Sequence, residues 1–206
     1  MSIIQQRIYL ASQSPRRREL LKQIGVNFEM LLLRSDPRRN MDVDETPHAG
    51  EAPEDYVKRV CLAKSEAGFS ALRLRNLPPF PVLAADTTVT LDGKIFGKPG
   101  NAEQAAAMLR QLSGQEHKVL SAVAVALGDH VESAVSISTV RFAPLDDERI
   151  RRYLLTREYI DKAGAYAIQG HAGAFIEHIT GSYSGVMGLP LFETVELLRH
   201  FDYPVS

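Results

Sequence analysis

The stretch PVLAADTTVTLDGKIF, residues 81–96, decides the fold of this 206-residue chain. Its first five residues are a continuous apolar run, typical of a strand buried on both faces of a sheet, and this run ends on Asp86. Further along, Asp92-Gly93 lies between two short strand-like runs, 89–91 and 94–96, and this dipeptide is typical of a tight hairpin turn. The stretch therefore predicts a buried strand that ends in a carboxylate, followed by a β-hairpin.

Strand and helix signals alternate on both sides of this stretch, and their spacing follows the strand and helix periods. The alternation predicts an α/β fold, a mixed twisted sheet with flanking helices. The expected elements, in chain order, are a strand at 8–11, a helix closed by Gly25, a long polar loop at 34–53, a helix at 53–67, a helix at 101–112, a pair of strands at 119–127 and 131–142, and helices at 146–156 and 190–201.

Composition narrows the function classes. With 45% hydrophobic and 24% charged residues, the chain is typical of a globular protein, and its length predicts a single domain over residues 1–206. Because 24 Lys and Arg face 25 Asp and Glu, no general basic field exists, so we expect neither nucleic acid nor a membrane as partner. Cys61 is the only cysteine, and residues 1–7 hold no long apolar run, which together favour a cytoplasmic location.

A basic segment, Ser12-Gln13-Ser14-Pro15-Arg16-Arg17, follows the first expected strand. Pro15 suits the first helical position and Ser14 the cap, so the two arginines fall in the first turn of a helix. Cations oppose the helix dipole there, which is understandable if the free N–H groups and the arginines bind an anion such as phosphate. The alternative is a solvated basic turn.

Two lysines are candidates for binding a phosphate chain. Lys64 shares the apolar stripe of its expected helix with Val57, Val60 and Cys61, so it points toward the core or a cleft. Alternatively, its stem packs there while its ammonium group extends to water. Lys98 lies between Gly97 and Pro99-Gly100 in a stiff turn, although lysines are common in turns.

Carboxylates and one amide complete the candidates. Asp86 could bind a divalent metal or activate water at the end of its strand, or act only as a turn or cap acceptor. Glu45, in the acidic run 42–45, could add a metal ligand when the loop closes, although such runs are often only solvated. The amide of Gln169 matches the carbonyl and N–H edge of uracil or thymine. No P-loop, G-x-S-x-G or dinucleotide fingerprint occurs in a strand-to-helix context, which disfavours kinase-like and dehydrogenase chemistry.

Several of these segments together resemble the Maf family of nucleotide pyrophosphatases, from Ile8 to about Phe201. They occur in the family's order along the chain. The matching segments are Ala11-Ser12-Gln13-Ser14-Pro15-Arg16-Arg17, Asp44-Glu45, Ala63-Lys64, Ala85-Asp86-Thr87, Lys98-Pro99, and Asp161-Lys162-Ala163-Gly164-Ala165-Tyr166 leading into Ile168-Gln169-Gly170.

The resemblance implies two lobes around a central cleft, as also in inosine triphosphate pyrophosphatases, with Asp86 as the proton acceptor that activates water. Arg16, Thr87 and Gln169 match positions that set base preference in the branch hydrolysing dTTP and UTP. The resemblance also leans toward a homodimer. The predicted site comprises catalytic Asp86, Lys64, Lys98 and Glu45; Asp86 and Glu45 as ligands of Mg²⁺ or Mn²⁺; and substrate-binding Ser12, Ser14, Arg16, Arg17, Thr87 and Gln169.

Two alternatives remain open from the sequence. One keeps the enzyme but changes the substrate to N7-methyl-GTP or another non-standard purine triphosphate. That branch carries an aromatic residue near the first arginines, whereas here Arg17 and Arg18 follow Arg16. The other is a regulatory protein of septum formation, the process from which the family takes its name, which would use its surface rather than a cleft.

Overall fold

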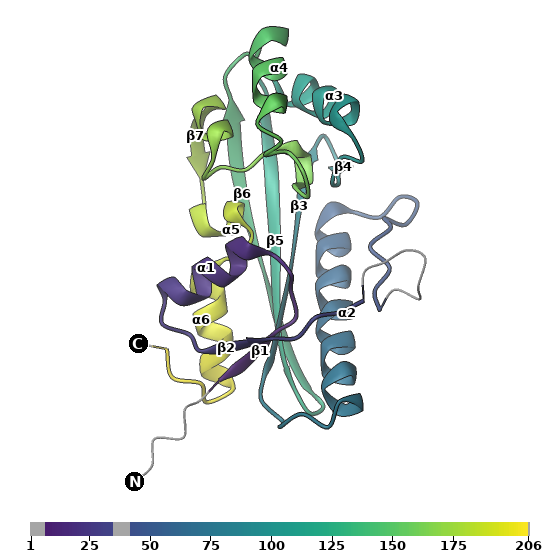
Figure 1. The fold of residues 1–206 in the computed structure, drawn as a ribbon, viewed down its shortest axis with the longest axis vertical. Helices are drawn as coiled ribbons and strands as arrows, with labels where there is room; N and C mark the ends of the chain where they lie inside the picture. Colours follow the sequence, from purple (N-terminus) through teal and green to yellow (C-terminus); the bar gives the residue numbers. More distant parts are fainter. Residues whose placement is uncertain (1–6, 35–41, 206) are drawn as a thin grey trace.

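One sheet of seven strands runs the length of the molecule in the computed structural model, which describes residues 7–34 and 42–205 (Figure 1). The strands are β1 (Ile8–Leu10), β2 (Phe28–Met30), β3 (Val82–Leu91), β4 (Lys94–Phe96), β5 (Glu116–Leu127), β6 (His130–Phe142) and β7 (Ile176–Thr180). The helices are α1 (Pro15–Gln23), α2 (Pro53–Leu74), α3 (Ala102–Leu112), α4 (Asp147–Leu155), α5 (Tyr183–Met187) and α6 (Leu191–His200), with short 3₁₀ turns η1 (Ala163–Ala165) and η2 (His171–Phe175).

The sheet is mixed, which confirms the predicted fold class. Its strand order is β2-β1-β3-β5-β6-β7, and β4 pairs with β3 off this path. β1 lies parallel to β2 and β3, whereas the other pairs are antiparallel. The Asp92-Gly93 turn joins β3 to β4 as predicted, with Leu91 opposite Lys94.

Two lobes share the long strands β3, β5 and β6 (Figure 1). The lower lobe holds β1, β2, α1, α2 and α6; α2 packs on one face of the sheet through residues such as Val57, and α1 and α6 pack on the other through Leu20 and Leu198. The upper lobe holds α3, α4, β4 and β7 around buried side chains such as Phe142 and Tyr153. The predicted two-lobed arrangement is therefore present.

Strand β3 differs from the prediction in one respect that matters for the site. It does not end at Asp86 but continues to Leu91, because β-branched residues follow and β5 pairs with it from Val82 to Thr90. Asp86 therefore lies in the middle of β3, opposite Ala122 on β5. The expectation that its carboxylate sits beyond a strand end was wrong.

The helices follow the prediction closely, with one exception. α2 extends to Leu74 rather than stopping near Ala67. Gly68 lies within it where the helix approaches the sheet closely, since a Cβ there would lie 2.8 Å from Val82 Cγ1. The short elements β2, β7 and α5 were not predicted, since three to five residues carry little periodicity. No helix among the described residues is both long and apolar enough to cross a membrane.

Candidate active site

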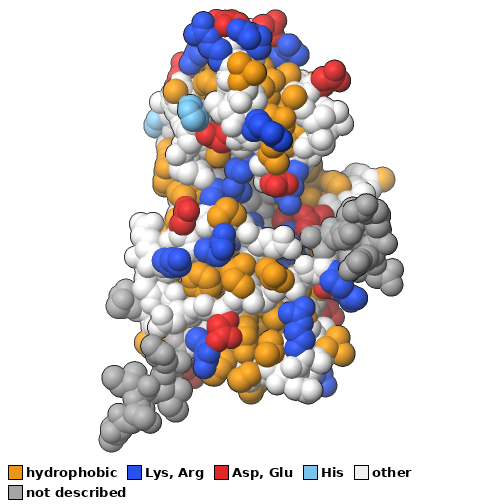
Figure 2. Space-filling model, in the orientation of Figure 1, with side chains coloured by type: hydrophobic (Ala, Val, Ile, Leu, Met, Phe, Trp, Pro, Cys, Tyr) orange, Lys and Arg blue, Asp and Glu red, His pale blue; other side chains and the backbone are white. Residues whose placement is uncertain are grey.

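A cleft of about 810 Å³ opens between the lobes at the middle of β3. Charged side chains of both signs gather at this level on the face shown in Figure 2. The structure brings every site residue predicted from the sequence to this one cleft, although those residues come from six separate segments. They are Ser12, Ser14, Arg16, Arg17, Glu45, Lys64, Asp86, Thr87, Lys98 and Gln169.

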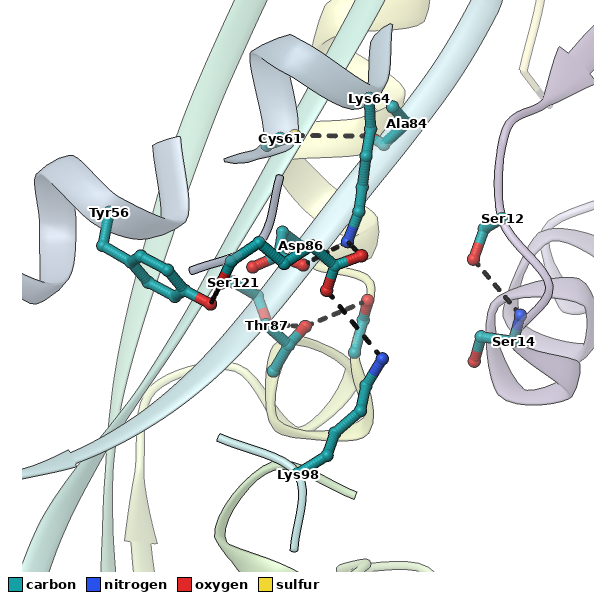
Figure 3. Close-up of polar contacts among 12 residues, drawn as sticks. Ser12, Ser14, Tyr56, Cys61, Lys64, Ala84, Asp86, Thr87, Lys98 and Ser121 are labelled. Atoms are coloured by element: carbon teal, nitrogen blue, oxygen red, sulfur yellow. Dashed lines mark hydrogen bonds and ion pairs between the residues drawn. The ribbon is translucent and has the colours of Figure 1, made fainter. Parts of the chain in front are cut away.

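Lys64 and two carboxylates form the centre of the cleft (Figure 3). Its ammonium Nζ lies 2.7 Å from Asp86 Oδ1 and 3.0 Å from Glu45 Oε1. The side chains of Lys64 and Asp86 are only 13% and 9% exposed, so the alternative in which Lys64 extends to water is wrong. Among the described residues, only Lys64 hydrogen-bonds to the Asp86 carboxylate, which leaves Oδ2 available to a ligand or water.

The loop before α2 brings Glu45 to this pair. Tyr56, in the first turns of α2, donates a hydrogen bond to the backbone oxygen of Glu45 at 3.0 Å. Burial opposes ionisation of the Glu45 carboxyl, but the charge and hydrogen bond of Lys64, together with Lys98, outweigh it and hold its pKa below the ordinary value. Lys98 Nζ lies 3.9 Å from Glu45 Oε2, so the Glu45 carboxylate, although 43% exposed, is paired with lysines as well as solvated.

The two arginines of α1 face the end of α5 rather than solvent. Arg16 Nε donates to the Met187 carbonyl at 3.2 Å, and Arg17 Nε donates to the Gly188 carbonyl at 2.7 Å. Burial lowers the pKa of both guanidinium groups, and the carboxylate of Asp86 partly offsets this for Arg17. The interpretation as a solvated basic turn is therefore wrong.

Serines shape the start of α1 in a different way from the predicted cap. Ser14 occupies the cap position, but its side chain makes no capping hydrogen bond. Instead, the Ser14 backbone N–H donates to Ser12 Oγ at 3.2 Å, and Arg17 Nη1 donates to the same oxygen at 3.0 Å. Ser12 thus fixes the turn that aims the helix N-terminus at the cleft.

Thr87 and Gln169 also line the cleft. Because successive residues of a strand point to opposite faces, Thr87 turns toward α1 and α5 while Asp86 turns toward Lys64. Gln169 is exposed at the cleft rim and makes no hydrogen bond with a described residue, so its amide is free to bind a ligand. It is not a buried amide that braces its glycine-rich segment.

Lys162 is a cleft residue to which sequence analysis gave no role. It is partly buried, and burial followed by the charge of Arg16 lowers the pKa of its ammonium group. Its Nζ donates to the Ile160 carbonyl at 2.9 Å. It lies in a turn, where no periodicity marks an inward side chain; the signal was its place in the segment that carries the family resemblance.

The predicted metal ligands fit a divalent cation in part. Asp86 and Glu45 both place an oxygen within 3.0 Å of one ammonium nitrogen, so the two carboxylates are close enough to share a cation. Within residues 7–34 and 42–205, no cluster of three or more His, Cys, Asp or Glu side chains could hold a metal. Mg²⁺ commonly uses one or two carboxylates plus substrate phosphates, and this donor set fits that pattern.

Comparison with known proteins gives consistent matches over nearly the whole chain. The family "Maf-like protein" matches residues 7–201. Proteins named dTTP/UTP pyrophosphatase are similar: that of Aromatoleum aromaticum is 60% identical over 206 residues, covering 100% of both chains, and that of Nitrosospira multiformis is 56% identical, covering 97% of this chain and 96% of its own. The solved structure of the Staphylococcus aureus Ham1 protein aligns over 95% of this chain and 97% of its own at 17% identity, with a TM-score of 0.48. The family match over residues 7–201 and the relatives at 56–60% identity show that the chain belongs to the Maf family.

Proposed function

We propose that this protein hydrolyses dTTP and UTP to the nucleoside monophosphate and pyrophosphate. The names of its relatives, at identities up to 60%, support this substrate class. The single observation in the structure that supports the chemistry best is the Asp86 carboxylate, held by Lys64 in the middle of β3 and facing a cleft lined with cations.

Asp86 is suited to accept a proton from water. Lys64 fixes Oδ1, so the carboxylate is held in one orientation, with Oδ2 left to take the proton as water attacks the phosphorus atom. Cations around the cleft then balance the negative charge of the triphosphate and of the leaving pyrophosphate. These cations are Arg16, Lys64, Lys98 and Lys162.

Asp86 and Glu45 would hold the Mg²⁺ or Mn²⁺ that we propose as cofactor. When bound, such an ion neutralises phosphate oxygens and polarises the phosphorus atom. Lys64 contacts both carboxylates, so it keeps them together and limits their repulsion before a ligand enters.

We assign base selectivity to Gln169. Gln169 offers one acceptor and two donors at the rim, which match the carbonyl and N–H edge of uracil or thymine. The N7-methyl-GTP branch carries an aromatic residue near the first arginines, whereas this chain has Arg17 and Arg18 there. We therefore prefer dTTP and UTP to N7-methyl-GTP as substrates. We also prefer an enzymatic function in the cleft to a purely regulatory role.

A nucleotide panel tests the proposal. The purified protein, with Mg²⁺ or Mn²⁺, is offered dTTP, UTP, CTP, GTP, ITP and N7-methyl-GTP, and the release of pyrophosphate is scored against orthophosphate. We expect pyrophosphate from dTTP and UTP, lost on chelation of the metal and in Asp86→Asn. Orthophosphate release, or a preference for a purine nucleotide, would contradict the proposal.

Location and assembly extend the same proposal. We propose the cytoplasm as the location, because the single cysteine, Cys61, is a buried free thiol and no disulfide within the chain is possible. The homodimer implied by the family resemblance stays a prediction, which sedimentation equilibrium can check.

A further inference from the structure

The hydroxyl of Thr87 belongs to a chain of hydrogen bonds that joins four elements, α1, β3, β5 and α5, at the cleft wall. Arg17 Nη2 lies 3.4 Å from Thr87 Oγ1, and Thr87 Oγ1 lies 2.8 Å from Ser121 Oγ on β5. Ser121 Oγ in turn lies 2.7 Å from the carbonyl oxygen of Gly185 in α5. Thr87 and Ser121 are direct cross-strand partners, so the pairing of β3 with β5 fixes this contact.

The two ends of the chain fix its direction. A carbonyl oxygen only accepts, so the single proton of Ser121 goes to Gly185 and its lone pairs are left for Thr87. Thr87 must then be the donor in the pair with Ser121, or else donate to the Gly188 carbonyl at 3.4 Å. A guanidinium group only donates, so Arg17 takes one lone pair of Thr87.

We infer that Ser121 is a positioning residue that holds the Thr87 proton inside the protein, so that Thr87 presents only a lone pair to the nucleotide. Ser121 is buried, at 1% exposure, and does not line the cleft, so it acts only through Thr87. The inference rests on the proposed function, because it concerns how a nucleoside triphosphate is recognised.

An acceptor facing the cleft selects a donor on the ligand. Phosphate oxygens at neutral pH are acceptors, so Thr87 does not bind the triphosphate chain. Its partner is a hydrogen-bond donor of the nucleoside, and dTTP and UTP share two such donors, the N3–H of the base and the 3′-hydroxyl of the sugar. Thr87 thereby discriminates against a nucleotide that offers an acceptor at that point.

Two analogues distinguish these donors. N3-methyl-UTP lacks the base donor, and 3′-deoxy-UTP lacks the sugar donor. We expect wild-type protein to prefer UTP over one of them by about tenfold or more in kcat/KM, since a lost partner leaves a polar group unpaired. That preference should be lost in Thr87→Val, kept in Thr87→Ser, and reduced in Ser121→Ala, where only the Gly188 carbonyl at 3.4 Å remains to keep the Thr87 proton from turning into the cleft.

Ser138→Ala is the matched control. Ser138 is similarly buried, at 2% exposure, and its Oγ bonds to the backbone of Ser182 at the start of α5, but it does not contact Thr87. Both serine variants should lower the unfolding temperature, because each loses a buried hydrogen bond to the α5 segment, yet only Ser121→Ala should change the analogue ratio.

The outcomes separate the inference from the proposed function. If wild-type protein releases no pyrophosphate from UTP, the proposed function fails. If it does, but the analogue ratios are the same in wild type, Thr87→Val and Ser121→Ala, the inference alone is overturned. A ratio that changes equally in Ser121→Ala and Ser138→Ala would also overturn it, since that result indicates a general loosening of α5.

Discussion

The charged side chains on the two walls of the cleft have different kinds of partner. On the α2 wall, formed by Glu45, Lys64 and Asp86, charged side chains pair with one another. On the α1/α5 wall, formed by Arg16, Arg17 and Thr87, cations donate to backbone carbonyls and hydroxyl groups. An ion pair can exchange a partner when a charged ligand arrives, whereas a carbonyl bond fixes the backbone. We propose that the α2 wall carries out the hydrolysis and that the α1/α5 wall positions and recognises the nucleotide.

Asp86→Asn should give the largest effect and tests the α2 wall directly. Asparagine is nearly isosteric but a poor proton acceptor and metal ligand, so we expect turnover to fall about a hundredfold or more. Lys64 keeps Glu45 as its partner, so the fold should survive. The assay is pyrophosphate release with thermal unfolding in parallel; near-normal turnover would remove Asp86 from the mechanism.

Lys64→Ala should come next, with Lys98→Ala behind it. Removal of Lys64 leaves two carboxylates without their shared countercharge, so we expect turnover to fall about 10- to 100-fold at saturating metal. Lys98 is 58% exposed and its Nζ lies 3.9 Å from Glu45 Oε2, so we expect Lys98→Ala to lower turnover by about tenfold or less. Lys58→Ala, on the exposed face of α2, is the matched control. If Lys64→Ala and Lys98→Ala both behave like wild type, as Lys58→Ala should, the α2 wall does not carry the chemistry.

Arg17→Lys separates charge from geometry on the α1/α5 wall. Lysine keeps the charge but cannot bond Gly188, Ser12 and Thr87 together, as the guanidinium fork does. We expect the free energy of unfolding in urea to fall by about 1–3 kcal/mol, and turnover to fall with it. An Arg17→Lys variant that keeps both its stability and its turnover would show that only the positive charge at this position matters, as expected for a simple phosphate contact.

Gln169→Ala sharpens the comparison at the base. Removal of the amide should reduce discrimination for dTTP or UTP over other triphosphates by about 1–3 kcal/mol, read as ratios of kcat/KM. Because Gln169 is exposed at the rim, thermal stability should not change. A uniform loss across four nucleotides with an unchanged ratio would refute the base-reading role.

Acid pH should have the smallest effect, on the loop of the α2 wall. The pKa of Glu45 lies below its ordinary value of 4.5, so its ion pairs stabilise the closed loop above that pH and are lost as the pH falls through the lower, folded pKa. The exchange rate of the backbone amides in residues 42–52, divided by the intrinsic rate at the same pH, should therefore rise on acidification. In Glu45→Gln that additional rise should be absent; an equal rise in both proteins would assign it to other carboxyl groups.

Much of the fold could be predicted from local pattern. The Asp92-Gly93 hairpin, the β5–β6 pair and the last helix were found because turn chemistry and periodicity act over a few residues. The continuity of β3 through Asp86 was missed, since an acidic residue within a strand is stabilised only by a partner on another element, here Lys64. The roles of Lys162 and Ser121 depend on contacts that no local pattern marks.

The longer helices, most of the strands, the family resemblance and the residue types of the site could all be read from the sequence, because they follow from short-range periodicity and from motifs read in order. Only the tertiary structure decided which charges meet and which way each hydroxyl donates. Arg17 and its acceptor Gly188 are 171 residues apart, and Lys64 reaches Asp86 across 22 residues through the packing of α2 on β3. The physical reason is that a buried cation takes the acceptor that packing places beside it, and packing is a property of the whole chain.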